Sequence, residues 1–284
     1  MKSRCFLHTA VVAMAVAVLG GCLSSGAYVR YRNVRSFEGF EDDLVTLADY
    51  GESGRRAASR YLEESLEDED IARADRALES ARRACVRVRV EADGVKDSGT
   101  GILIDGGRRV ATAGHILRHP YVDRIDVLLP DGRRFPARID RKGEGSGGAG
   151  AASDWCVLEV LLPKGETLPS VETGSPRRGG LGLYFYYAEP VGVGAEGRVV
   201  DVRATPDLAP LYPIPMVGRV VSRDPIRIAP VAGAVPLAGS SGGPVLDLDG
   251  KLIGLLTERV STPARRGVHI ALRGPSVRSL DIGS

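Results

Sequence analysis

From Cys85 onward, apolar residues recur at every second position in short runs that turn-forming residues separate. In the first run Cys85, Val86, Val88 and Val90 alternate with two arginines, which is the pattern of a half-buried strand. Similar runs follow at 100–104, 125–129, 135–139, 155–161, 181–187, 198–202, 217–221, 245–248, 252–256 and 268–272. Asp-Gly steps, which supply the positive-φ residues of tight hairpins, lie at 105–106, 131–132 and 249–250. Such strands and turns predict an all-β barrel or sandwich and exclude a fold of repeated βαβ units.

Residues 28–83 follow a polar, helical pattern instead. Leu62 and Leu66 are four residues apart, and several Glu-Arg pairs have the same separation in the order that favours a helix. We expect one or two amphipathic helices, which act as a spacer within a tether segment, 22–83. The acidic run at 63–70 is expected to be a solvated face.

The first residues have the pattern of an export signal. Lys2 and Arg4 precede an apolar run at 6–19, which is too short for a comfortable membrane span. Two glycines then stand directly before Cys22, and this arrangement resembles the bacterial lipobox. The resemblance implies a signal peptide at 1–21, lipid on Cys22, and a place outside the cytoplasm, on the periplasmic side of a membrane or at the cell surface. The alternative is an ordinary cleaved signal with an incidental cysteine.

Charge and cysteine usage narrow the class of partner. Removal of the signal takes away Lys2, Arg4 and no acidic residue, so the formal charge falls from +2 to zero and no nucleic-acid partner is expected. Cys85 and Cys156 then remain in apolar, strand-like surroundings, where they form either one disulfide or two buried thiols. Neither belongs to a CxxC pair, so we expect no metal and no cofactor.

A candidate general base follows the short apolar run 109–111. The box Thr112-Ala113-Gly114-His115 has small residues before its histidine, which leaves both imidazole nitrogens reachable at a strand end. His119 and His269 have no comparable surroundings, and for them a structural role is the simpler interpretation.

A candidate acid opens the apolar run at 155–161. A carboxylate at Asp154 can accept a hydrogen bond from an imidazole Nδ1–H, fix the tautomer and stabilise the imidazolium that forms. An Asp before a buried strand is common, so this assignment depends on the other two segments.

A candidate nucleophile lies in the box Gly239-Ser240-Ser241-Gly242-Gly243-Pro244. Ser241 has only glycines on its C-terminal side, and Gly239 permits the backbone to turn its N–H toward a substrate carbonyl. The N–H groups of Gly239 and Ser241 are therefore the expected oxyanion hole.

Together these segments resemble the trypsin/chymotrypsin-like serine protease family, and most closely its bacterial Deg-type, HtrA-like branch. The resemblance extends over about 86–272 and depends on short motifs at 99–101, 112–115, 154–158, 189–192 and 239–244. The order His, Asp, Ser and the gaps of 39 and 87 residues between them also suit the family.

The resemblance implies two antiparallel six-stranded β-barrels with a catalytic triad of His115, Asp154 and Ser241 in the cleft between them. The expected protease domain is 84–274, divided near residue 170, with a C-terminal tail at 275–284. The implied activity is hydrolysis of peptide bonds in a peptide or protein substrate through an acyl-enzyme.

The chain also departs from the family pattern. Ser240 stands where the family usually has Asp or Asn, so activation by a new N-terminus paired with that residue is not available. The resemblance implies that the base of the specificity pocket lies at Val235 and that its wall is formed by His269, Ile270 and Ala271. No carboxylate stands at the base, so a small or medium apolar residue is expected before the scissile bond.

Two rival functions compete with this one. The motif at 239–243 also satisfies the Gly-x-Ser-x-Gly elbow of α/β-hydrolases, but that fold needs βαβ alternation and the order Ser, Asp, His, and only His269 follows Ser241. The stronger rival is a catalytically inactive protease fold that acts as a lipid-tethered binding or scaffold module. Trp155 and the glycine-rich loop before Asp154 are the features that favour it.

Overall fold

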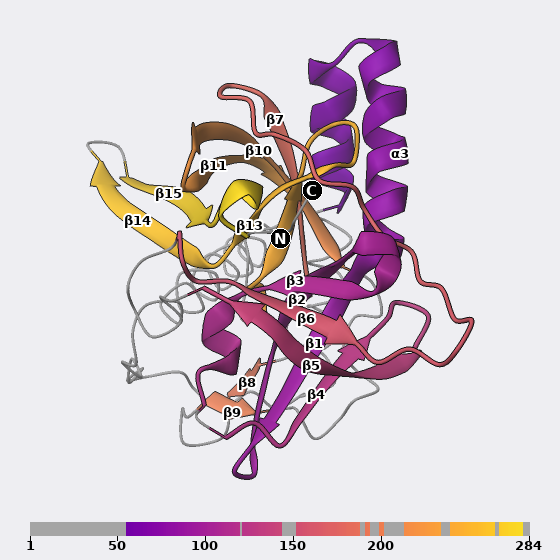
Figure 1. Cartoon of the computed structure of the whole chain (residues 1–284). Coiled ribbons are helices and arrows are strands. Elements are labelled where there is room, and N and C mark those ends of the chain that lie inside the picture. The colour runs from indigo at the N-terminus through magenta and orange to yellow at the C-terminus, as the bar shows by residue number, and fades with distance from the viewer. Residues whose placement is uncertain are drawn as a thin grey trace, which may run out of the picture.

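A computed structural model describes residues 55–119, 121–143, 152–187, 191–193, 199–201, 213–233, 239–264 and 267–280. The described chain forms two antiparallel β-sheets, one after the other in sequence, with a pair of helices packed beside them (Figure 1). The predicted signal peptide and Cys22 lie outside the described residues. Within the part of the chain that is described, neither helix has the length and apolar character that a membrane span requires.

The first sheet is a closed six-stranded barrel in the order β1-β2-β3-β6-β5-β4. Its strands are β1 (Cys85–Ala92), β2 (Val95–Ile104), β3 (Arg109–Thr112), β4 (Arg124–Leu128), β5 (Arg134–Lys142) and β6 (Cys156–Val160). All neighbouring strands pair antiparallel. Val86, Val88 and Val90 of β1 point into the barrel and are at most 2% exposed, so the alternation predicted from sequence fills the barrel interior.

The second sheet has the order β13-β12-β7-β10-β11-β15-β14. Its strands are β7 (Leu181–Tyr186), β10 (Ile214–Arg223), β11 (Ile226–Gly233), β12 (Gly243–Leu246), β13 (Leu252–Leu256), β14 (Glu258–Ala264) and β15 (Gly267–Gly274). The Leu255 N–H donates to the Pro275 carbonyl at 3.0 Å and the Thr257 N–H to the Arg273 carbonyl at 3.0 Å, so the sheet curls until it nearly closes.

The all-β prediction with two barrel-like sheets is confirmed, although the second sheet has seven described strands where six were expected. The last strand in the order, β14, pairs as a hairpin with residues 267–273 of β15, which itself pairs with β11 only at 272–274. A separate short hairpin of β8 (Val191–Val193) and β9 (Val199–Asp201) joins neither sheet.

Two helices precede the first barrel, one over residues 55–65 and α3 (Asp68–Ala84). The buried face of α3 consists of alanines at 74, 77, 81 and 84, which lets the helix approach β1, β2 and β7 closely. Leu62 of the first helix is 2% exposed and belongs to the same core cluster. The Arg73 guanidinium holds Asp249, in the turn between β12 and β13, with nitrogen–oxygen distances of 2.9 and 2.7 Å. The helical segment therefore packs on elements of both sheets.

Candidate active site

His115 lies in a short 3-10 turn, Gly114–Leu117, directly after β3. Its backbone N–H donates to Asp154 Oδ1 at 2.8 Å, which ties the turn to the start of β6. A Cβ atom on Gly114 would lie 3.0 to 3.2 Å from the Trp155 backbone and from Asp154 Oδ1. The glycine before His115 therefore permits the close approach of these two segments.

Asp154 contacts the same histidine a second time through its other oxygen. Oδ2 is 2.7 Å from His115 Nδ1, and the Asp154 side chain is 16% exposed. Because one carboxylate holds both the backbone and the ring of His115, the imidazole has little freedom to rotate. This geometry favours the tautomer in which Nδ1 carries the proton and Nε2 is free to accept one.

Ser241 lies in the loop that leads into β12. Its Oγ is 2.8 Å from His115 Nε2, and the residue is 7% exposed. Gly242 has φ +83°, and a Cβ atom there would lie 2.2 Å from the Thr100 carbonyl oxygen. The glycine after Ser241 thus allows the loop of the second sheet to press against β2 of the first barrel.

Thr100 of β2 holds this loop from the opposite barrel. Its Oγ1 donates to the Gly239 carbonyl at 2.8 Å and its backbone N–H donates to the Ser241 carbonyl at 2.8 Å. The Thr100 side chain is fully buried. The Thr100 Oγ1 also accepts a hydrogen bond from the Tyr187 backbone N–H at 2.9 Å. Sequence reasoning marked the Gly-Thr-Gly motif as part of a resemblance but assigned Thr100 no role, because its partners are backbone groups far away in the sequence.

Gly239 adopts φ +86°, a left-handed conformation that side-chain-bearing residues rarely take. Among the described residues, none accepts a hydrogen bond from the N–H of Gly239 or of Ser241. Within the part of the chain that the structure describes, both predicted oxyanion-hole donors thus have no acceptor, and their role stays a prediction.

The remaining predicted site residues have no described side chains. Val235 lies outside the described residues, and His269, Ile270 and Ala271 belong to β15, of which the backbone alone is described there. The predicted specificity pocket stays a prediction.

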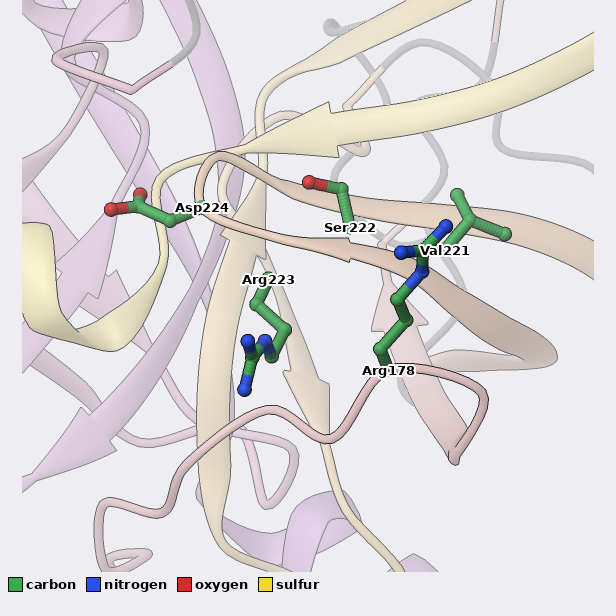
Figure 2. Close-up of a pocket in the computed structure, with 5 residues that line it drawn as sticks. All are labelled: Arg178, Val221, Ser222, Arg223 and Asp224. Atoms are coloured by element: carbon green, nitrogen blue, oxygen red, sulfur yellow. The ribbon is translucent and has the colours of Figure 1, made fainter.

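A surface cavity of about 440 Å³ lies at the other end of the second sheet (Figure 2). It is lined by Arg178, Val221, Ser222, Arg223 and Asp224, and no residue of the His115 cluster borders it. In Figure 2 the Asp224 carboxylate points away from the guanidinium groups of Arg178 and Arg223. The cavity has no nucleophile beside a base, so it is separate from the candidate active site.

Both described cysteines are free thiols. Cys85 and Cys156 are fully buried, in β1 and β6 of the first barrel. Burial raises the pKa of Cys85 well above its usual range and raises the pKa of Cys156 to about 12. Of the two alternatives left open by the sequence, the structure has the pair of buried thiols, and neither is an activated nucleophile.

The cluster thus joins a hydroxyl, an imidazole and a carboxylate in one hydrogen-bonded chain. This is the arrangement that nucleophilic attack on a carbonyl needs, because the base can remove the hydroxyl proton as the new bond forms. A family model described as trypsin-like peptidase domain matches residues 99–255, more than half of the 284 residues, and its span includes all three side chains. The chain therefore belongs to the trypsin-like peptidase family.

Proposed function

We propose that the protein is a serine endopeptidase in which Ser241 is the nucleophile, His115 the general base and acid, and Asp154 the group that orients His115. The observation that carries the proposal is the unbroken chain from Asp154 Oδ2 to His115 Nδ1 at 2.7 Å and from His115 Nε2 to Ser241 Oγ at 2.8 Å. Both distances are those of hydrogen bonds already formed without substrate.

The reaction follows from this chain. Ser241 Oγ attacks the carbonyl carbon of the scissile peptide bond while its proton passes to His115 Nε2. The carbonyl oxygen becomes an oxyanion, which the N–H groups of Gly239 and Ser241 stabilise. The imidazolium then protonates the leaving amine, the peptide C–N bond breaks, and an acyl-enzyme remains. Water, activated by the same imidazole, attacks the ester and restores Ser241.

The nucleophile loop is expected to be competent without proteolytic activation. Ser240 offers no carboxylate to pair with a new N-terminus, and it is only 3% exposed. Hydrogen bonds to buried neutral groups hold the loop instead. We also propose membership of the Deg-type branch, for which the support is the set of short motifs between 99 and 244. A small or medium apolar residue is expected before the scissile bond, because no carboxylate stands at the expected base of the specificity pocket.

Labelling with a fluorophosphonate probe tests the catalytic proposal. The wild type is expected to label covalently and to hydrolyse an unfolded protein substrate, and Ser241→Ala is expected to do neither while folding normally. A wild type that never labels would establish the inactive scaffold alternative, and labelling that survives Ser241→Ala would identify another nucleophile.

We also propose that the mature chain is anchored through lipid on Cys22 and acts outside the cytoplasm. The support is the export-signal pattern of residues 1–21 and the two glycines directly before Cys22. Metabolic incorporation of palmitate into the wild type, and its loss in Cys22→Ser, is the expected result. Equal incorporation in both proteins would refute the anchor.

A further inference from the structure

Three consecutive carbonyls of the nucleophile loop each accept a hydrogen bond from a group outside the loop. Thr100 Oγ1 holds the Gly239 carbonyl at 2.8 Å, and the Thr100 N–H holds the Ser241 carbonyl at 2.8 Å. Between them, the phenolic oxygen of Tyr184 donates to the Ser240 carbonyl at 2.9 Å. The first barrel therefore holds two carbonyls, and the second sheet holds the one between them.

The middle bond controls the direction of an oxyanion-hole donor. A trans peptide is planar, so its carbonyl and the N–H of the next residue point to opposite sides. The peptide that carries the Ser240 carbonyl also carries the Ser241 N–H. By drawing that carbonyl toward β7, Tyr184 turns the Ser241 N–H to the opposite side.

Tyr184 is built to be rigid. It lies in β7 between Met216 of β10 and Val245 of β12, is 1% exposed, and stacks on Tyr186 with ring centroids 5.6 Å apart. A Cβ atom on Gly243 would lie 2.2 Å from the Tyr184 ring, so the glycine after Gly242 makes room for it. Burial also raises the pKa of the Tyr184 phenol far above its usual range, which keeps the hydroxyl protonated and able to donate.

We infer that Tyr184 is a positioning residue of the oxyanion hole, and this inference rests on the proposed peptidase function. Its phenol does not touch the substrate, but it fixes the peptide plane whose N–H binds the developing oxyanion. Such a donor is effective because it is oriented before the reaction begins. A neutral buried hydroxyl thereby fixes the loop beside Ser240, which has no charged group for that purpose.

The Ser240 carbonyl has a second donor, the Gly243 N–H at 2.9 Å, which closes a turn within the loop. Loss of the Tyr184 hydroxyl is therefore expected to loosen the peptide plane and not to release it. The effect on kcat should be smaller than the ~10²–10³-fold that follows removal of a donor itself, and we expect about tenfold.

The test is Tyr184→Phe, which removes one oxygen atom and keeps the ring. Turnover is measured per active site, counted by fluorophosphonate titration, so that unfolded molecules do not enter kcat. Binding of an uncleaved peptide is compared between Ser241→Ala and Ser241→Ala/Tyr184→Phe. We expect kcat to fall about tenfold, and to fall by the same factor at every pH. The dissociation constant of the peptide should stay within twofold.

Tyr187→Phe is the matched control. Its phenol also is buried and donates to a backbone carbonyl, that of Cys85 at 3.1 Å, but this carbonyl lies where α3 meets β1. Tyr187→Phe should lower the melting temperature about as much as Tyr184→Phe and keep kcat within twofold of the wild type.

A kcat within threefold of the wild type in Tyr184→Phe would overturn the inference, as would an equal loss in Tyr187→Phe or a loss matched by weaker peptide binding. A wild type that neither labels nor cleaves would overturn the peptidase proposal itself, and the role of Tyr184 with it.

Discussion

Replacement of Asp154 by asparagine isolates its effect on the histidine tautomer. In the wild type Asp154 Oδ1 accepts the His115 backbone N–H at 2.8 Å and Oδ2 faces Nδ1 at 2.7 Å. Asparagine has only one oxygen, which retains the backbone bond, so its NH₂ group faces the ring. Nδ1 must then accept, the ring proton moves to Nε2, and Nε2 can no longer take the proton of Ser241.

The expected loss is about 10⁴-fold in kcat, the size of effect seen when a triad histidine is held in the wrong tautomer. At about 1.4 kcal/mol for each factor of ten, this corresponds to roughly 5 kcal/mol of transition-state stabilisation. The folded structure should persist, because asparagine matches aspartate in shape and the side chain is mostly buried in a site that it still fits.

The assay measures kcat for a peptide ester and a peptide amide from pH 6 to 10, together with the melting temperature. Asp131→Asn serves as the control, since that carboxylate lies in an exposed turn of the same barrel and pairs with Arg133. It should leave kcat unchanged. An Asp154→Asn variant that is folded and keeps more than a tenth of wild-type kcat would refute the assigned orientation of His115.

Thr100→Val should lower the free energy of unfolding by about 1–3 kcal/mol, because the Gly239 carbonyl loses its donor. Thr100→Ser keeps the hydroxyl and should keep most of the stability, and urea denaturation of both variants measures the difference. Leu62→Ala should lower the free energy of unfolding, measured by urea denaturation, by about 2–5 kcal/mol. Leu66 is only partly buried, so Leu66→Ala should lower it by clearly less. Equal effects would mean that the first helix does not pack as described. Burial raises the pKa of Cys156 to about 12, so the folded state holds this proton more tightly than the unfolded state does. The unfolding free energy should therefore fall as the pH rises above about 8.5 toward 12, and Cys156→Ala should flatten that dependence in denaturation series at several pH values.

Two strands of the second sheet, β11 and β14, were absent from the sequence prediction, and each contains a proline. Pro230 of β11 pairs with Gly218 beside a register shift, where a missing N–H does not break the ladder. Pro263 lies in β14, which is the last strand in the order of the sheet, so its nitrogen has a free side. Both prolines are compatible with the sheet because of where they lie in it, one beside a register shift and the other in an end strand.

The helices before the barrel were predicted from the periodicity of their sequence, and Leu62, one of the spaced leucines, is buried. The buried positions of α3 are all alanines, whereas its one leucine, Leu78, is half-buried. Alanines permit the close approach of this helix to the strands, but they contribute little to a hydrophobic pattern in the sequence.

Local sequence was sufficient for the strand alternation, for the small residues that expose His115, and for the glycines around Ser241, because each of these depends on neighbours within a few positions. The contact of Asp154 with His115 spans 39 residues and arises because β3 pairs with β6 in the first barrel. The contact of Ser241 with His115 spans 126 residues, and only the packing of the two sheets brings these side chains to hydrogen-bond distance. Thr100 and Tyr184 were out of reach of sequence reasoning for a further reason. Their partners are backbone groups, which every residue possesses, and no pattern of residue types records which of these groups a folded chain presents to a buried hydroxyl.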